Sequence, residues 1–520
     1  MRLTVTAMIS LVALLAGVSA PEAGARELPM ELPGQAGVAQ ASDWLIGVKE
    51  PLSASEARRL GGRRLLDGRA LVVPRAAARA VAAKLDGGGR LLYAEPNMRL
   101  ARSSAPESSR SGWARGAVVN ASLAPPSPGG AKIAVIDDFV DPTHPELAGN
   151  VSFLNTGRIA GSHGTAVASA AAAIDGNGGI FGVFPGAQIL SAQPRNLSCA
   201  GVAEAVDLAT EANPDVMNLS LGTTQDCVTL WIAIQTAYGS GIVVVASAGN
   251  EFEEGNPVIY PAAWPHVISV AALGRKLSPA YFSSANAAVD ISAPGMSVPV
   301  AVPPAFDRED NARDGYTRAD GTSFSAPMVA GAAAWIRSAR SDLTQGQVAD
   351  LLRYSATDIG RRGWDRDTGW GLLNVGRALT ARTPEVDPLE PNDLIPEVSG
   401  ALFAEPDDFI WDGSEPTSLR AAVDKVEDPV DIYRISIPGR RSAAISVTPS
   451  AGDANLEVYD GSATYVGQAS RRVARSRRPG RRTDSVRIRN RAATAAVAYV
   501  AIAPYAGAFL DARYRLTIKG

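Results

Sequence analysis

Between Ala131 and about Ala381, the sequence alternates short, mostly apolar runs with longer runs that have helical length and spacing. The apolar runs lack a regular polar alternation, which is typical of strands buried on both faces of a parallel sheet. Three such runs are 133–136, 216–219 and 242–245, and helix-like runs such as 202–212 and 228–238 stand between them. The predicted fold class is therefore α/β, with a mainly parallel sheet covered by helices.

Two further units flank this region. Residues 44–100 alternate strand-like and helix-like runs in a small α+β pattern, and the polar stretch 101–112 that follows is predicted to be open to proteolysis. Residues 383–400 are rich in proline and acidic residues, which is typical of a linker. Beyond them, short strands punctuated by Gly, Pro and Asp predict an all-β sandwich over 401–520. The strand-like runs are 432–437, 443–447, 456–459, 497–501 and 514–518.

The first residues have the pattern of an export signal. Arg2 precedes an apolar run from Leu3 to Val18, and small residues follow. Cleavage after Ala25 satisfies the small-x-small rule, so we expect a signal peptide over 1–25 and a secreted product, extracellular or periplasmic. No later segment has 18 uninterrupted apolar residues, which predicts no membrane span.

Composition excludes several classes of function. The net charge of −3 gives no general argument for binding nucleic acid. Two cysteines exclude a disulfide-rich scaffold and a four-cysteine zinc site, and three histidines argue against a multi-histidine metal centre. Ten arginines lie between Arg471 and Arg491. A solvated loop is favoured there over a patch for anionic polymers or cell surfaces.

Three segments of the α/β region carry residues suited to nucleophilic catalysis. Asp137 follows the strand-like run 133–136, His163 begins a small-residue helix, and Ser323 lies between a glycine and another small-residue helix. Taken singly, such an Asp or Ser is more often a helix cap. Together they supply a nucleophile, its base and the acid that orients the base. Their order along the chain, Asp, His, Ser, is the subtilisin order.

Residues 113–382 resemble a subtilisin-like serine protease (subtilase) domain. Four motifs carry the resemblance: Ser162-His163-Gly164-Thr165-Ala166-Val167-Ala168-Ser169, Gly321-Thr322-Ser323-Phe324-Ser325-Ala326-Pro327, Ser247-Ala248-Gly249-Asn250 and Asn218-Leu219-Ser220-Leu221-Gly222. The resemblance implies that Asp137, His163 and Ser323 are catalytic and that Asn250 belongs to the oxyanion hole. It also implies that Ser220, Leu221 and Gly222 bind substrate, and that Ile259 forms the floor of the primary specificity pocket. No catalytic metal is implied.

Some positions depart from the family pattern. Phe139 stands where the family usually has glycine, and Ala166 where a second histidine is often found. Neither change removes a catalytic group. The branched Ile259, at a position that is often glycine, predicts a preference for small residues on the acyl side of the cut. His144 and His266, beside prolines, are predicted to be structural or surface histidines.

The flanking units have family resemblances of their own. Residues 44–100 resemble an inhibitor-type subtilase propeptide, mainly through 92–97, so we expect residues 26–110 to be a propeptide that inhibits its own protease domain, 111–382. Residues 401–520, with the preceding 390–393, resemble the pre-peptidase C-terminal β-sandwich of secreted bacterial proteases.

These features predict a secreted serine endopeptidase, made as a self-processing zymogen, that acts on protein or peptide substrates without a required cofactor. Two alternatives stay open: a dedicated processing protease with a single target, and a surface-binding protein on an inactive protease scaffold.

Two smaller predictions concern stability. In an exported chain the isolated pair Cys199 and Cys227 favours one disulfide, with two buried free thiols as the alternative. Residues 175–179 and Glu146 fall near positions where many subtilases bind structural calcium. The family motif is not matched residue by residue, so no residue is assigned as a metal ligand.

Overall fold

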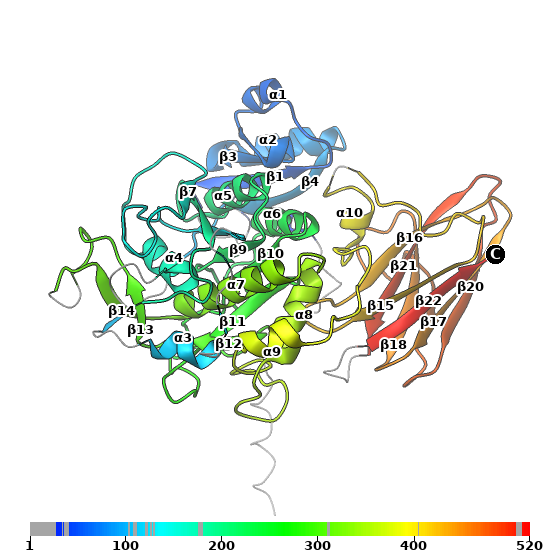
Figure 1. Ribbon diagram of the computed structural model, residues 1–520. Helices are drawn as coiled ribbons and strands as arrows, with labels where there is room; N and C mark the ends of the chain where they lie inside the picture. Colours follow the sequence, from blue (N-terminus) through cyan, green and yellow to red (C-terminus); the bar gives the residue numbers. More distant parts are fainter. Residues whose placement is uncertain are drawn as a thin grey trace, which may run out of the picture.

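The structure, a computed structural model, describes residues 28–33, 35, 41–101, 105–107, 112–119, 123–124, 127, 130–174, 180–308, 312–403, 405–505 and 512–520. The predicted signal peptide, 1–25, lies outside these residues, as does the segment 175–179 considered for calcium. The described residues form a small α+β unit, a central α/β unit and a β-sandwich at its side (Figure 1). Within them, no helix is long and apolar enough to cross a membrane.

The central unit is built on a seven-stranded sheet in the order β12-β11-β10-β9-β6-β8-β7, and all of its strand pairs are parallel. Its strands are β6 Lys132–Ile136, β7 Val151–Phe153, β8 Gln188–Ala192, β9 Val216–Leu219, β10 Val243–Ser247, β11 Val267–Leu273 and β12 Ile291–Pro294. Successive side chains of a strand point to opposite faces. In β6, Ile133 and Val135 therefore enter one core, and Ala134 and Ile136 enter the other.

Helices cover both faces of this sheet. The core on one face includes α4 His163–Ala172, α7 Thr322–Ala339 and α8 Gln345–Ser355, and the core on the other includes α5 Cys199–Glu211 and α6 Val228–Gly239. Two short helices, α3 Trp113–Val118 and α9 Val375–Thr380, complete the unit. A small antiparallel sheet, β13-β14-β5, lies at its edge, with β13 Val298–Ala301, β14 Tyr316–Asp320 and β5 Ala105–Glu107. The predicted α/β class is confirmed.

The N-terminal unit packs on α5 and α6 (Figure 1). Its antiparallel sheet has the order β2-β3-β1-β4. The elements are β1 Asp43–Val48, α1 Ala54–Arg59, β2 Arg63–Leu65, a 3₁₀ turn Leu66–Gly68, β3 Ala70–Pro74, α2 Arg75–Gly87 and β4 Leu91–Pro96. One face of this sheet packs on α2, and Leu45 and Tyr93 of the other face are buried in the core of α5 and α6.

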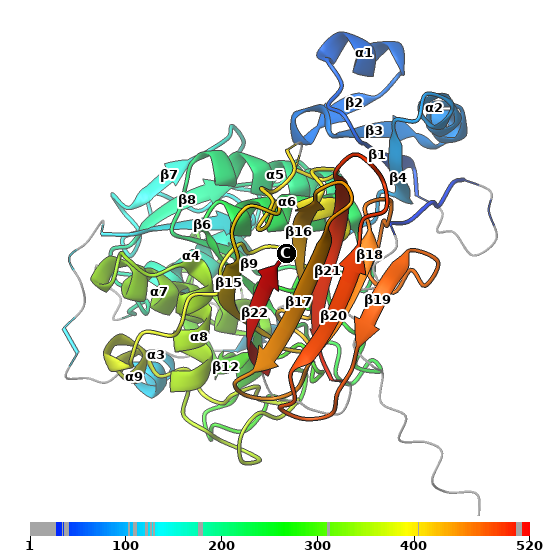
Figure 2. The ribbon, with the colours of Figure 1, turned by 90° about the vertical axis from the view of Figure 1, so that its right-hand side faces the viewer.

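The C-terminal unit consists of two antiparallel four-stranded sheets, β15-β22-β17-β20 and β16-β21-β18-β19, which stack face to face (Figure 2). The elements are α10 Ile395–Val398, β15 Thr417–Val423, β16 Asp431–Ile437, β17 Ser442–Pro449, β18 Ala454–Asp460, β19 Arg472–Ser476, β20 Asp484–Arg489, β21 Ala496–Pro504 and β22 Ala512–Lys519. Buried and less buried residues alternate along β22, as expected for a sheet with one face on a core. The predicted all-β sandwich is confirmed.

Two segments differ from the sequence prediction. The arginine-rich stretch 471–491, predicted as a loop, contains strands β19 and β20 because Ala474, Val486 and Ile488 pack against the sandwich core while arginines alternate with them. The stretch 383–400, predicted as a linker, includes α10, whose residues are buried.

The sandwich contacts the central unit directly. Arg353 of α8 lies 3.4 Å from an oxygen of Asp290 and 3.6 Å from an oxygen of Glu427, which stands between β15 and β16. The backbone N–H of His266 also donates to the carbonyl of Glu427 at 3.3 Å.

Candidate active site

Three of the predicted site residues follow strands that are neighbours in the central sheet. Asp137 follows β6, Ser220 follows β9, and Asn250 lies three residues after β10. These strands lie side by side in the order β10-β9-β6. Because they are parallel, their carboxyl ends meet at one edge of the sheet, where open α/β sheets place functional groups.

The other two catalytic candidates begin helices at the same edge. His163 is the first residue of α4, and Ser323 is the second residue of α7. A Cβ on Gly164 would lie 2.0 Å from the carbonyl oxygen of Asp138, so only glycine lets α4 approach the end of β6 this closely. Gly321, which precedes α7, has φ 144°, a conformation that favours glycine.

Asp137 and His163 form the predicted acid–base pair. Nδ1 of His163 donates to Oδ2 of Asp137 at 2.8 Å, and the backbone N–H of Asp138 donates to Oδ1 at 2.7 Å. Asp137 is fully buried. With Nδ1 occupied as a donor, Nε2 is the nitrogen that can accept a proton. It is buried and has no hydrogen-bond partner among the described residues.

Ser323 and Ser220 are joined by reciprocal hydrogen bonds. The hydroxyl of Ser220 donates to the carbonyl of Ser323 at 2.8 Å, and the hydroxyl of Ser323 donates to the carbonyl of Ser220 at 3.3 Å. Nδ2 of Asn218 also donates to the Ser220 hydroxyl, at 3.0 Å. The start of α7 is thereby fixed to the end of β9, and the bond that holds the Ser323 hydroxyl is the longest of the three.

The orientation of the Asn250 amide follows from its partners. Its Oδ1 accepts from the backbone N–H of Thr322 at 3.0 Å and from the Thr322 hydroxyl at 2.8 Å. A backbone N–H can only donate, so the oxygen of the amide must face Thr322 and Nδ2 must point elsewhere. The N–H of Ser323, in the first turn of α7, has no acceptor within the helix. These two donors beside the serine are the components of an oxyanion hole.

A described stretch of chain, 97–101, occupies the groove beside these residues. The N–H of Ala101 donates to the carbonyl of Gly222 at 2.8 Å, and the N–H of Gly222 donates back at 3.1 Å. On the other side, the N–H of Leu100 donates to the carbonyl of Leu197 at 2.6 Å, and the N–H of Cys199 donates to the carbonyl of Met98 at 2.7 Å. The segment is thus bound between two strands as an added strand, one of the common modes of peptide recognition.

Just before this segment, Glu95 caps helix α6. The carboxylate accepts from the backbone N–H groups of Val228 and Thr229, both at 2.8 Å, and from the Thr229 hydroxyl at 2.8 Å. The Tyr93 hydroxyl shares a 2.9 Å hydrogen bond with the same Thr229 hydroxyl. The positive end of the helix dipole favours a carboxylate here. Sequence reasoning missed this role, because locally Glu95 belongs to a strand.

Ile259 lies between the two walls of the predicted specificity pocket. A Cβ on Gly222 would be 2.4 Å from Cγ2 of Ile259, and a Cβ on Gly249 would be 2.6 Å from its Cγ1. The branched side chain, which is buried, therefore fills the space between the 220–222 segment and the loop that carries Asn250. Leu221 is also buried.

The predicted disulfide is absent from the structure, which has Cys199 and Cys227 as free, buried thiols. The two side chains are nevertheless in contact, and burial together with the neighbouring Cys199 raises the pKa of the Cys227 thiol well above its ordinary value. The Cys227 thiol also lies 3.6 Å from Oε1 of Glu95. Cys199 begins α5 and Cys227 precedes α6, so both thiols stand where the helices meet the segment 95–101.

The remaining predicted residues have structural surroundings. His144 is buried and bonded to the backbone of Gly315 and Glu146. Glu146 accepts from the Tyr316 hydroxyl at 3.0 Å. Phe139 packs edge-on against Phe153 at 5.2 Å and leaves the Asp137 carboxylate in place.

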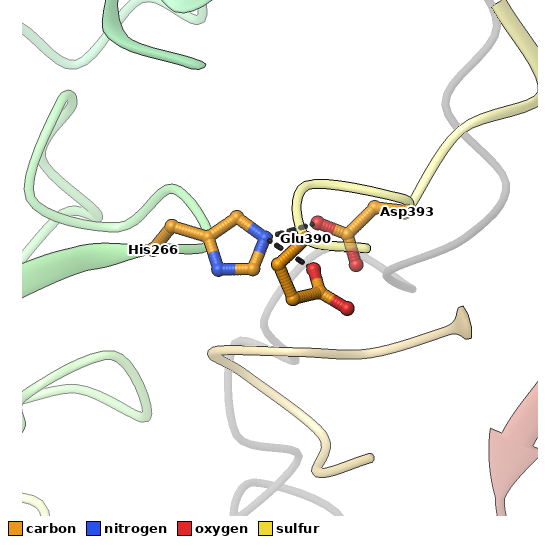
Figure 3. Close-up of side chains that lie close together, drawn as sticks. All are labelled: His266, Glu390 and Asp393. Atoms are coloured by element: carbon orange, nitrogen blue, oxygen red, sulfur yellow. Dashed lines mark ion pairs between the residues drawn. The ribbon is translucent and has the colours of Figure 1, made fainter. Parts of the chain in front are cut away.

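His266, predicted as a structural or surface histidine, lies elsewhere, with Nε2 facing two carboxylates. It is 2.9 Å from Oδ2 of Asp393 and 3.3 Å from Oε2 of Glu390 (Figure 3). The sequence gave no signal for this contact, since the two acids lie more than a hundred residues further along the chain.

Comparisons with known proteins agree with this geometry. Residues 129–371 match the model of the Subtilase family. Over 259 residues the chain is 36% identical to subtilisin from Bacillus pumilus, covering 48% of this chain and 90% of that protein. It is also 36% identical over 259 residues to subtilisin E from Bacillus subtilis (strain 168), covering 48% of this chain and 65% of that protein. The chain thus spans slightly less than two thirds of subtilisin E.

A longer match extends beyond the central unit. Fervidolysin from Fervidobacterium pennivorans is 33% identical over 312 residues, covering 54% of this chain and 44% of that protein. Its crystal structure, described as that of a keratinolytic enzyme related to subtilisin, superposes with a TM-score of 0.59 at 20% identity, covering 89% of this chain and 87% of that one. This similarity supports the fold of all three units.

Proposed function

Because the chain belongs to the subtilase family, we propose that it is a serine endopeptidase, made as a zymogen that cuts itself and is then inhibited by its own propeptide. The observation that carries the proposal is the position of the segment 97–101. It lies as an added strand in the groove whose walls also hold the catalytic candidates.

The proposed reaction is acyl transfer. The Ser323 hydroxyl leaves the carbonyl of Ser220, donates to Nε2 of His163 and attacks the carbonyl carbon of the substrate as the proton passes to the imidazole. His163, held by Asp137, then gives that proton to the leaving amine, and water releases the acyl group by the same steps. Nδ2 of Asn250 and the N–H of Ser323 stabilise the oxyanion that forms in between.

The flanks of the predicted maturation region support self-cleavage. Ala101 is paired with Gly222, and Ala105 is paired with Asp320, three residues before Ser323. Ser323 is itself bonded to Ser220, two residues before Gly222. The two anchors therefore lie on either side of the nucleophile, and we propose that the chain is cut between Ala101 and Ala105.

The same contacts support inhibition after the cut. The propeptide would keep its backbone bonds in the groove and the Glu95 cap on α6, so it would stay bound until it is unfolded or digested. Export is proposed from the signal-like residues 1–25, and the product would act outside the cytoplasm. In that oxidising environment we further propose that Cys199 and Cys227, already in contact, form a disulfide.

Expression of the wild type beside Ser323→Ala tests self-processing. The wild type should yield a fragment that begins between Arg102 and Ala105, whereas Ser323→Ala should accumulate uncut, as read by intact mass and N-terminal sequencing. Ser325→Ala is the matched control, because this buried hydroxyl two residues further along α7 bonds only the carbonyls of Ala293 and Pro294. Equal maturation of Ser323→Ala and wild type would contradict the proposal.

A further inference from the structure

A group of carboxylates lies where the central unit meets the β-sandwich. Asp387 and Glu390 come from the segment after α9, Asp428 precedes β16, and Asp431 is its first residue. One carboxylate oxygen from each of the four lies within 4.8 Å of those of the others. We call these four residues the carboxylate cluster.

The cluster is shielded from water. Asp431 is fully buried, and the Glu390 side chain is 7% exposed. Burial, followed by the neighbouring acids, raises the pKa of Asp387 to about 9 and the pKa values of Glu390 and Asp428 well above their ordinary range. Burial also raises the pKa of Asp431 to about 7. These shifts mean that negative charge gathered here is not compensated by the residues around it.

Each carboxylate has one oxygen that lacks a hydrogen-bond donor. In the described part of the chain, these are Oδ1 of Asp387, Oε2 of Glu390, Oδ1 of Asp428 and Oδ1 of Asp431. The opposite oxygen is held in three of the four. Asp387 accepts from the N–H of Ala422 at 2.6 Å, Glu390 accepts from Asn392 at 2.6 Å, and Asp431 accepts from the Tyr514 hydroxyl. The protein thus fixes these side chains by one oxygen and leaves the other available, although a buried anion without a partner is costly.

His266 supplies only a partial answer. Its ring stacks on Tyr238 at 4.3 Å, and its Nε2 faces Glu390 and Asp393 (Figure 3). A single imidazole, even when protonated, carries one positive charge. It contacts Glu390 alone among the four carboxylates of the cluster, so Asp387, Asp428 and Asp431 need a different counter-charge.

We propose that Asp387, Glu390, Asp428 and Asp431 bind one calcium ion. All four ligands are hard oxygen donors, which calcium and magnesium prefer over zinc. Four anionic side chains suit calcium better than magnesium, because calcium takes six to eight oxygen ligands in flexible geometry and magnesium usually retains several waters with one or two carboxylates. A cavity of about 330 Å³, lined in part by Asp387, Glu390 and Asp428, gives water and the ion access.

The position of the site gives the ion a structural role. Asp387 and Glu390 belong to the segment that leaves the central unit, and Asp428 and Asp431 belong to the sandwich. A bound ion therefore fastens this segment to the start of β16, beside the Arg353–Glu427 contact that joins the two units. Calcium should protect the loop before β16 from proteolysis.

The test uses the full-length Ser323→Ala precursor, which cannot digest itself. After treatment with EDTA and dialysis, calcium binding per chain is measured by equilibrium dialysis for this parent and for Asp428→Asn, His266→Gln and Asp408→Asn in the same background. Asp428→Asn should bind one calcium fewer per chain, while His266→Gln and the exposed-site control Asp408→Asn should bind as the parent does. Equal stoichiometry in the parent and Asp428→Asn would overturn the proposal.

A second measurement guards against misfolding of the variant. Trypsin cleavage after Lys425, three residues before Asp428, is timed with and without calcium. With calcium at about ten times its dissociation constant, mass action lowers the open fraction, and hence the cleavage rate, about tenfold. Asp387→Asn, on the other side of the site, should lose this protection. Protection by zinc alone that disappears in His266→Gln would assign the metal to the histidine side and refute the calcium site.

Discussion

Glu95 is the residue through which the propeptide is most open to a clean perturbation. We expect Glu95→Gln to weaken inhibition by the cleaved propeptide while leaving the catalytic groups untouched. In the glutamine variant, Oε1 can still accept from the N–H and hydroxyl of Thr229. The new NH₂ must then face the N–H of Val228, which now donates to the second carboxylate oxygen at 2.8 Å.

The size of the effect follows from that lost bond. A hydrogen bond to a charged group contributes about 1.5–3 kcal/mol, and burial of Glu95 keeps water from replacing it. At about 1.4 kcal/mol per tenfold change, the inhibition constant should rise about 10- to 150-fold. Loss of the negative charge at the helix N-terminus acts in the same direction.

The assay is inhibition of the matured protease by purified propeptide, with the constant taken from progress curves on a peptide substrate. Glu50→Gln, at an exposed position of the same unit, is the matched control and should inhibit like wild type. Inhibition by Glu95→Gln within twofold of wild type would refute the claim that this cap contributes to propeptide binding.

Three other changes probe the catalytic unit. Asn250→Ala should lower kcat by about 10²–10³ with little change in KM, the range known for removing this kind of donor in a subtilisin; a kcat within threefold of wild type would remove Asn250 from the oxyanion hole. Ile259→Gly should raise kcat/KM at least about tenfold for peptides with Phe or Leu before the cut, since one methylene is worth about 1–3 kcal/mol. A wild type that already prefers Phe or Leu, unchanged by the substitution, would contradict the wedge role of Ile259. Alkylation of exported protein without reduction should label neither Cys199 nor Cys227, whereas labelling of both would rule out their disulfide.

The catalytic candidates could be located from the sequence because each lies in a short motif at the end of a strand or the start of a helix. Asp137 follows a run of apolar residues that can only be a buried strand, and the parallel sheet then dictates which ends meet. The orientation of the Asn250 amide could not be read in this way. It depends on Thr322, which is 72 residues away and contacts Asn250 only after α7 has packed.

The features that sequence reasoning missed depend on contacts between distant segments. Glu95 meets Thr229 across 134 residues, and no local pattern marks a strand residue as the cap of a remote helix. The carboxylate cluster joins a stretch whose composition predicted a linker to a loop of the sandwich. Composition reported the acids but not their convergence, because burial of like charges is a property of the assembled junction.

Strand β5 has a consequence for the timing of activation. It pairs with β14 up to Ala105 opposite Asp320, so a cut between Ala101 and Ala105 leaves the newly made amino terminus beside Ser323. The released propeptide can diffuse away or be digested, but this end is part of the protease itself. A tethered segment of this kind competes at an effective concentration that dilution does not change. The enzyme would therefore carry its own first-order delay, set by how fast β5 peels from β14, however dilute the protein becomes after export.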